Sequence, residues 1–164
     1  MAEPKTTTTI VDKDTKLEQL PDTSKWAKVF CSETLTGERT QVGYVEEVPQ
    51  LEEAPEQITG QCLDLGYEFA QPGIIKAGTV ELPIFHTHTQ YKNFRGKMNK
   101  DLYWFFQNPA HTAPAGTEPL VRYFKGQMYI TMDTISVGEF LKDKMTLYKS
   151  TAMEESEGFP TTTP

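Results

Sequence analysis

The chain has 164 residues and a mass of 18.6 kDa, a size that predicts one domain. It contains 16 Lys and Arg against 23 Asp and Glu, so its formal net charge is −7. This acidic balance argues against a protein that binds nucleic-acid phosphates tightly, because such proteins need a basic surface. The sequence has no apolar segment near its beginning and no run of about 18 apolar residues, so we expect neither an export signal nor a membrane span.

Residues 1–25 are expected to form a polar N-terminal arm. The segment carries a run of four threonines, two prolines and charges of both signs. Its larger aliphatic side chains are Ile10, Val11, Leu17 and Leu20. These are too few to build a core, so the arm is either disordered or ordered against a neighbouring subunit.

Residues 26–151 are expected to form the folded domain, and most of their apolar residues follow the patterns of β-strands. In chain order the expected strands are 26–31, 42–48, 58–63, 66–69, 79–85, 102–106, 120–133 and 137–148. Pro83 lies within one of them and lacks an N–H group, which predicts that this strand lies at an edge or contains a bulge.

One segment of the domain has a helical pattern, with apolar residues three to four apart over residues 88–99. Residues 108–119 contain three prolines and predict a loop, and residues 152–164 are expected to form a flexible C-terminal tail. The predicted fold class is therefore mainly β: an antiparallel β-sandwich or barrel with one flanking α-helix and flexible terminal arms.

Charge is unevenly distributed along the sequence. No Lys or Arg occurs between Gln41 and Ile75, whereas seven carboxylates lie there: Glu46, Glu47, Glu52, Glu53, Glu56, Asp64 and Glu68. The basic counterpart comprises Lys92, Arg95, Lys97 and Lys100. A chain with two poles of this kind suits head-to-tail association between subunits, and the alternative is an ordinary solvated surface with uneven charge.

Catalytic chemistry has little support in the sequence. His86 and His88 form an H-x-H pair and His111 is the third histidine, so a metal site built on these three is a weak alternative. No H-E-x-x-H motif, nucleophile motif or phosphate-binding loop occurs. Cys31 and Cys62 are too few for a disulfide framework. We therefore expect no enzymatic activity, no metal and no cofactor.

Aromatic residues are concentrated in one run, from Tyr103 through Trp104 and Phe105 to Phe106. A continuous run predicts a strand covered on both faces, by the core on one and by the helix or a partner on the other. A carbohydrate-binding platform would instead expose aromatic side chains on a single face. A small β-sandwich that binds carbohydrate or a receptor is therefore the main alternative function.

The order of segments resembles the tail tube (major tail) proteins of long-tailed bacteriophages. The resemblance runs from VEEVPQLEEAPEQITGQC at 45–62 through the QPGI turn at 71–74, the strand at 78–85, the helix at 91–98 and the aromatic strand at 102–106. It continues through FKGQ at 124–127 and the final strand at 137–151. The Thr-rich N-terminal arm and the proline loop at 108–119 depart from the family pattern.

The resemblance implies a β-sandwich-like fold assembled into hexameric rings. These rings would stack into a hollow tube, in which inner strands of all subunits join in one barrel around the lumen. The implied partners are other copies of the chain, the tape measure protein, the tail terminator and the distal tail or baseplate proteins, with double-stranded DNA in transient passage and no membrane. The implied location is the tail of the virion, after assembly in the host cytoplasm.

Specific residues follow from this implied assembly. A wall that repels a polyanion keeps DNA mobile, so we expect the lumen to be lined by some of the acidic residues Glu46, Glu47, Glu68 and Glu81. Contacts between stacked rings are expected from the loop residues Gln50, Leu51, Glu52 and Glu53. The arm residues Ile10, Val11, Leu17 and Leu20 are expected to add to these contacts.

Overall fold

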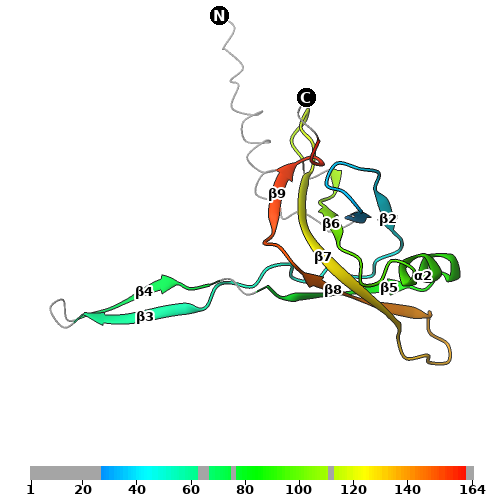
Figure 1. Cartoon of the computed structure of the whole chain (residues 1–164), viewed down its shortest axis with the longest axis horizontal. Coiled ribbons are helices and arrows are strands. Elements are labelled where there is room, and N and C mark those ends of the chain that lie inside the picture. The colour runs from blue at the N-terminus through cyan, green and yellow to red at the C-terminus, as the bar shows by residue number, and fades with distance from the viewer. Residues whose placement is uncertain (1–26, 63–66, 75–76, 111–112, 162–164) are drawn as a thin grey trace, which may run out of the picture.

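The computed structural model describes residues 27–62, 67–74, 77–110 and 113–161, with the backbone alone at 61–62 and 67–69. Figure 1 shows a curled sheet with a short helix at one end and a long hairpin that projects from the other. The elements are β1 (Lys28–Ser32), β2 (Thr40–Val42), β3 (Gln57–Cys62), β4 (Tyr67–Pro72), β5 (Thr79–Phe85), α2 (His88–Arg95), β6 (Leu102–Gln107), β7 (Leu120–Met132), β8 (Lys142–Lys149) and β9 (Glu154–Glu157). The predicted mainly antiparallel β fold with one helix is confirmed for these residues.

The main sheet has the strand order β2-β1-β6-β7-β8-β5, with β9 paired to β7 off this path. It forms an open half-barrel in the described part of the chain, because the terminal strands β2 and β5 do not pair with each other. β3 and β4 form a separate two-stranded sheet, the projecting hairpin in Figure 1, which we call the arm. No helix among the described residues is long and apolar enough to cross a membrane.

The long strand β7 joins the two halves of the sheet, and its partners change at Gly126. Gly126 pairs with Leu102 at the end of β6 on one side and with Lys149 at the end of β8 on the other. A Cβ atom at Gly126 would lie 2.3 Å from the carbonyl oxygen of Tyr148, a distance that only glycine avoids. The indole N–H of Trp104 donates to the Gly126 carbonyl at 3.3 Å. Glycine therefore allows the close approach at the point where the sheet changes partners.

The core lies on the concave side of this sheet and is built from alternate residues of each strand. Trp104, Leu82, Met145 and Leu147 are fully buried, and α2 adds Phe94. Apolar residues at every second position place one strand face in this core, as the sequence pattern predicted. Two expected strands differ from the structure. The strand expected at 42–48 is wrong beyond Val42, where β2 ends. The strand expected at 137–148 begins only at Lys142, because residues 133–141 form an exposed loop.

The other face of β6 is covered by the C-terminal segment. Phe105 is fully buried, and its ring centroid lies 5.8 Å from that of Phe159. Phe30 makes an edge contact with Phe159 at 5.2 Å, and the Arg39 guanidinium lies 4.5 Å from the centre of the Phe159 ring. The aromatic run is thus buried on both faces, as expected, but its second face is covered by Phe159 and Arg39, and not by the helix.

The prediction of a flexible tail over residues 152–164 is wrong at β9. This strand pairs with β7 from Leu120↔Glu157 to Tyr123↔Glu154. The Tyr123 hydroxyl donates to the Glu154 carboxylate at 2.7 Å, and this hydrogen bond raises the pKa of Tyr123 to about 12. Strand pairing by β9, the Tyr123–Glu154 hydrogen bond, the Arg39 hydrogen bond to the Pro160 carbonyl and the Phe159 ring therefore hold this segment against the sheet.

We predict that Phe159→Ala destabilises the fold by about 2 kcal/mol, because it uncovers Phe105 and removes the ring beneath Arg39. Urea unfolding followed by tryptophan fluorescence measures the change. Phe140→Ala is the matched control, since Phe140 is 83% exposed and its truncation is expected to cost less than about 0.5 kcal/mol. Equal effects of the two substitutions would contradict the role of Phe159.

Candidate assembly surfaces

The outer edge of β5 is open along half of its length. The amide of Phe85 donates to the Tyr44 carbonyl and that of Glu46 to the Pro83 carbonyl, both at 2.9 Å, so residues 44–46 cover the C-terminal half of this edge. Alternation along an antiparallel strand points the backbone groups of Thr79 and Glu81 toward the same edge, where the described residues provide no partner. The placement of Pro83 in an edge strand is confirmed. An open edge of this kind accepts another strand.

The convex face of β5, β8 and the second half of β7 is exposed and polar, because it carries the residues that alternate with the core. Lys144 pairs with Glu81 at 2.8 Å, and Lys142 pairs with Glu46 at 2.7 Å. Each hydrogen bond raises the pKa of its lysine, so both lysines stay charged. Tyr129 and Tyr148 are about half exposed on the same face. The face is therefore charged but locally neutral.

The structure separates the four acidic residues expected at a lumen. Glu46 and Glu81 lie beside the same sheet face, and each has a lysine partner. Glu47 is exposed and Glu68 lies on the arm, opposite Gln61 in the β3–β4 register, with its side chain outside the described residues. Sequence reasoning missed Lys142 and Lys144. The sequence shows that these two lysines are two residues apart on one expected strand, but it does not show which strand pairs with theirs.

The loop expected in ring stacking divides into one buried and three exposed residues. Leu51 is only 3% exposed and belongs to the core, and its carbonyl accepts a hydrogen bond from the Lys149 ammonium. Gln50, Glu52 and Glu53 are exposed beside it. Leu51 therefore anchors this loop and is not free for a contact between rings. Ile10, Val11, Leu17 and Leu20, expected in ring stacking from the N-terminal segment, lie outside the described residues.

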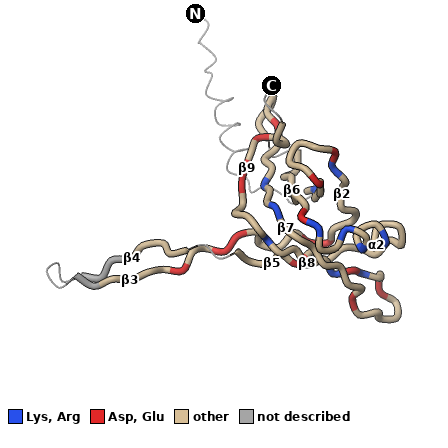
Figure 2. Tube along the Cα trace, viewed as in Figure 1, with Lys and Arg blue, Asp and Glu red and all other residues tan. Residues whose placement is uncertain are grey.

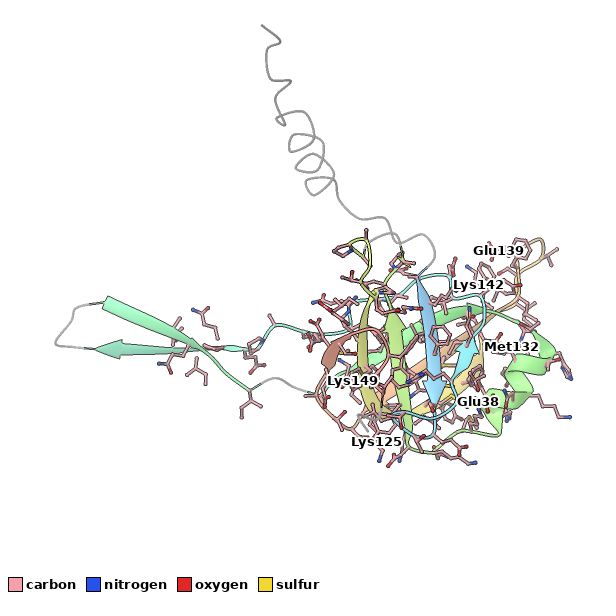
Figure 3. All side chains as sticks on the ribbon, turned by 90° about the horizontal axis from the view of Figure 1, so that it is seen from above. Glu38, Lys125, Met132, Glu139, Lys142 and Lys149 are labelled. Carbon is pink, nitrogen blue, oxygen red and sulfur yellow. The ribbon has the colours of Figure 1, made fainter. Side chains whose placement is uncertain are left out.

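A depression lies where the arm leaves the body. It has a volume of about 230 Å³, and its lining includes Glu52, Glu53, Lys149, Ala152 and Met153. Figure 3 shows Lys149 on this side of the body, whereas Met132, Glu139 and Lys142 lie on the opposite side. The depression is smaller than the roughly 300–1,000 Å³ of typical small-molecule sites. Its size fits a single side chain of a partner protein.

The opposite end of the body carries the loop at 133–141 and helix α2. Ile135, Val137 and Phe140 are 70%, 106% and 83% exposed, an unusual concentration of apolar side chains in a polar protein. The loop is held against the start of α2, because the His86 amide donates to the Leu141 carbonyl at 2.8 Å and the rings of Phe85 and Phe140 meet at 5.8 Å. Exposed apolar groups in an ordered loop are typical of a protein interface.

A largely buried hydrogen bond between two side chains lies beneath this loop. The Asp143 carboxylate is 1% exposed, and its oxygens lie 2.8 and 2.9 Å from Nδ1 of His86. Of the three histidines in the alternative metal site, His86 contacts Asp143, His88 is exposed and His111 lies outside the described residues. No group of three metal-ligating side chains occurs among the residues described. His86 therefore satisfies a buried carboxylate.

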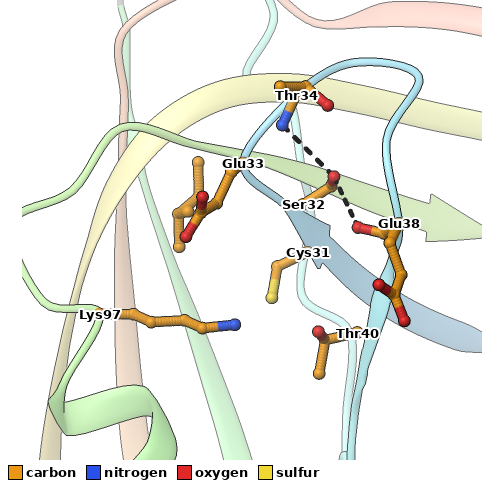
Figure 4. Close-up of a pocket in the computed structure, with 8 residues that line it drawn as sticks. Cys31, Ser32, Glu33, Thr34, Glu38, Thr40 and Lys97 are labelled. Atoms are coloured by element: carbon orange, nitrogen blue, oxygen red, sulfur yellow. Dashed lines mark hydrogen bonds between the residues drawn. The ribbon is translucent and has the colours of Figure 1, made fainter.

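A second cavity, of about 310 Å³, lies beside the end of β1 (Figure 4). The Ser32 hydroxyl donates to the Glu38 carbonyl at 2.8 Å and accepts the Thr34 amide at 3.3 Å, which closes the turn above the cavity. Lys97 reaches in from the segment after α2. Burial raises the pKa of the Cys31 thiol at its base to about 11, although Lys97 acts in the opposite direction. This thiol is protonated at neutral pH and is therefore a poor nucleophile.

Comparison with known proteins shows the fold. No protein-family model matches the chain, and no curated protein does. Its structure is similar to a chain of the PVC sheath-tube complex of an extracellular contractile injection system in the extended state, with a TM-score of 0.63 at 12% identity over 94% of this chain and 99% of that one.

Two further structures share the fold. A chain in the PVC sheath/tube terminator has a TM-score of 0.61 at 12% identity and covers 84% of this chain and 98% of its own length. A chain in the cap that terminates the tube of the anti-feeding prophage has a TM-score of 0.58 at 17% identity over 85% of this chain and 93% of that one. The likeness to these three chains covers 84–94% of this chain and 93–99% of theirs.

We predict that His86→Ala destabilises the protein by about 3 kcal/mol, because it leaves the buried Asp143 carboxylate without its histidine partner. Urea unfolding at pH 7 measures this loss. His88→Ala, the same truncation at an exposed position two residues away, is expected to change stability by less than about 0.5 kcal/mol. A small effect of His86→Ala would show that the pair does not support the loop.

We also predict that Cys31 resists alkylation by iodoacetamide at pH 7.5 and reacts quickly once urea unfolds the chain. A pKa of about 11 keeps the folded thiol protonated, so its reaction rate rises with pH up to that value. Peptide mass spectrometry measures the modification at Cys31 itself, separately from that at Cys62. Rapid labelling of folded Cys31 at neutral pH would contradict the burial.

Proposed function

We propose that this chain is a structural subunit of a phage-type tail tube, which assembles into hexameric rings that stack around a lumen. The observation that carries the proposal is the open half-barrel: a curled sheet with a polar convex face and, among the described residues, a β5 edge that is uncovered along its N-terminal half. Support comes from the shared fold with a chain of the PVC sheath-tube complex. It also comes from the resemblance of the sequence to phage tail tube proteins.

The open edge gives a physical reason for assembly. Unpaired N–H and C=O groups at a sheet edge invite pairing with another chain, and closure into a barrel removes the edge altogether. One copy provides only part of such a barrel. Pairing of the free half of β5 with a strand of a neighbouring copy would satisfy Thr79 and Glu81 and extend the sheet around a ring.

The convex face of β5, β8 and β7 is the proposed channel wall. Its two Lys–Glu pairs, Lys144–Glu81 and Lys142–Glu46, leave little net charge there. A wall without free cations forms few phosphate contacts and releases few counterions, so DNA would pass without tight binding. In this proposal the wall is neutral rather than strongly acidic, with Glu46 and Glu81 as the acidic members of its pairs.

The remaining surfaces fit partners along the tube. The projecting arm and the exposed residues Gln50, Glu52 and Glu53 are proposed to contact the next ring. In this role the tape measure protein and double-stranded DNA occupy the lumen, and the tail terminator and the distal tail or baseplate proteins bind the two ends of the tube. The particle is the tail of a virion or a related injection device, assembled in the host cytoplasm.

A second candidate role is that of a cap or terminator at the end of a tube. Two of the structures that share this fold are a sheath/tube terminator and a tube-terminating cap. Both roles are structural and use the same half-barrel, but they differ in self-assembly: a tube subunit stacks without limit, whereas a terminator stops at a single ring. The carbohydrate-binding alternative loses its basis, because Trp104, Phe105 and Phe106 are buried.

We predict that the purified full-length chain forms rings or hollow tubes as its concentration rises. Size-exclusion chromatography with light scattering measures the mass, and negative-stain electron microscopy shows the particles. Stacked tubes support the tube subunit and single rings support the terminator. The substitution Thr79→Pro introduces no charge but removes a backbone N–H at the open edge, so it should reduce assembly. A protein that remains monomeric at all concentrations would contradict both roles.

A further inference from the structure

Charged residues at the two ends of the molecule lack oppositely charged partners. At one end, α2 and the residues after it present Lys92, Arg95 and Lys100, and none of these forms an ion pair with the described residues. At the other end, Glu52 and Glu53 lie at the base of the arm and also lack ion pairs among the described residues. Figure 2 shows the basic positions around α2 and acidic positions at the base of the hairpin, with further acidic positions in the loop below α2, where Asp133 and Glu139 lie.

Three lysines of the sheet between these ends have such partners. Lys142, Lys144 and Lys125 each pair with a carboxylate within the chain, at 2.7, 2.8 and 3.7 Å. The convex face of β5 and β8 is therefore locally neutral, whereas Lys92, Arg95, Glu52 and Glu53 form no ion pair with the described residues. Uncompensated charges of opposite sign on opposite ends give one copy a surface complementary to the next.

Apolar groups occur in the same two places. Beside α2 lie Ile135, Val137 and Phe140 of the exposed loop, and at the base of the arm lies the depression of about 230 Å³ with Ala152 and Met153 in its lining. The loop offers protruding side chains and the depression offers a recess of the size of one side chain. An apolar centre with charged groups beside it is the usual composition of a specific interface.

We propose that the α2 end of one copy docks onto the arm base of a second copy of this chain. In this contact Lys92 and Arg95 face Glu52 and Glu53, while an apolar side chain of the loop at 133–141 enters the depression. The two surfaces differ and lie at opposite ends, so the contact is heterologous and each copy retains a free end for the next one. This inference rests on the proposed function, because it names the residues by which tube subunits contact one another.

Charge reversal tests the contact directly. The variant K92E/R95E makes both ends acidic, and E52K/E53K makes both ends basic, so each variant alone should assemble at a concentration about tenfold higher or more. An equimolar mixture of the two should assemble again, because each acidic end meets a basic one. The quadruple variant has the wild-type net charge with its poles exchanged, and it should assemble by itself.

The same measurements distinguish this inference from the proposed function. Assembly of both double variants at the wild-type concentration, or failure of the mixture and the quadruple variant to recover, would overturn the contact and leave the tube proposal intact. A wild-type chain that never assembles would overturn both. Val137→Asp tests the apolar part and should raise the assembly concentration, with Thr131→Asp, an exposed strand position outside the contact, as control. Unchanged urea midpoints verify that the variants are folded.

Discussion

The fold depends on the change of strand partners along β7. This strand of 13 residues pairs with β6 and β9 through its first half and with β8 through its second. Gly126 lies at the change, where the Tyr148 carbonyl comes so close that any Cβ atom would clash. A strand that serves two sheet halves in succession must bend, and the bend gives the sheet its curl. The concave core and the exposed convex face both result from this bend.

The curl also leaves the sheet incomplete. With six strands in its path, the described part of the sheet ends at the short strand β2 on one side and at β5 on the other. Residues 44–46 cover only the C-terminal half of the β5 edge, so the backbone groups of Thr79 and Glu81 that point to this edge have no partner in the described part of the chain. An isolated soluble protein usually protects such an edge with a charge, a proline or a covering segment. Here Pro83 and residues 44–46 protect one half, and the other half remains available.

Much of this architecture could be predicted from local patterns. Alternating apolar residues placed β5, β7 and β8, and a continuous aromatic run predicted that β6 is covered on both faces. β9 could not be predicted in this way, since its sequence EESE carries no apolar signal and its pairing depends on the backbone and on Tyr123. In the sequence, Phe159 is recognisable only as a single aromatic residue within a polar segment, which does not predict what it packs against.

The candidate surfaces were less predictable than the fold, because they depend on register. The acidic stretch was visible in the sequence, but whether a carboxylate is free or paired follows from the strand beside it. Glu81 faces Lys144 only because the β5–β8 register sets Pro83 against Lys144 and Glu81 against Thr146, which makes the two side chains diagonal neighbours. Leu51 looked like part of an exposed loop, yet it is the apolar residue that fixes this loop to the core.

Internal pairing and unpaired charge have separate physical consequences in this molecule. A lysine that pairs with a carboxylate on the convex face contributes little to the field felt by a polyanion, and it also has little attraction left for a neighbouring subunit. Lys92 and Arg95 lack such partners among the described residues and project from the end of the body, so their field extends into the solvent. The convex face is therefore weakly charged, whereas, among the described residues, the two ends of the body carry unpaired charges, basic on α2 and acidic at the base of the arm. Such a distribution favours end-to-end association of copies over binding of nucleic acid to the face, and it does so in a protein whose overall charge is −7.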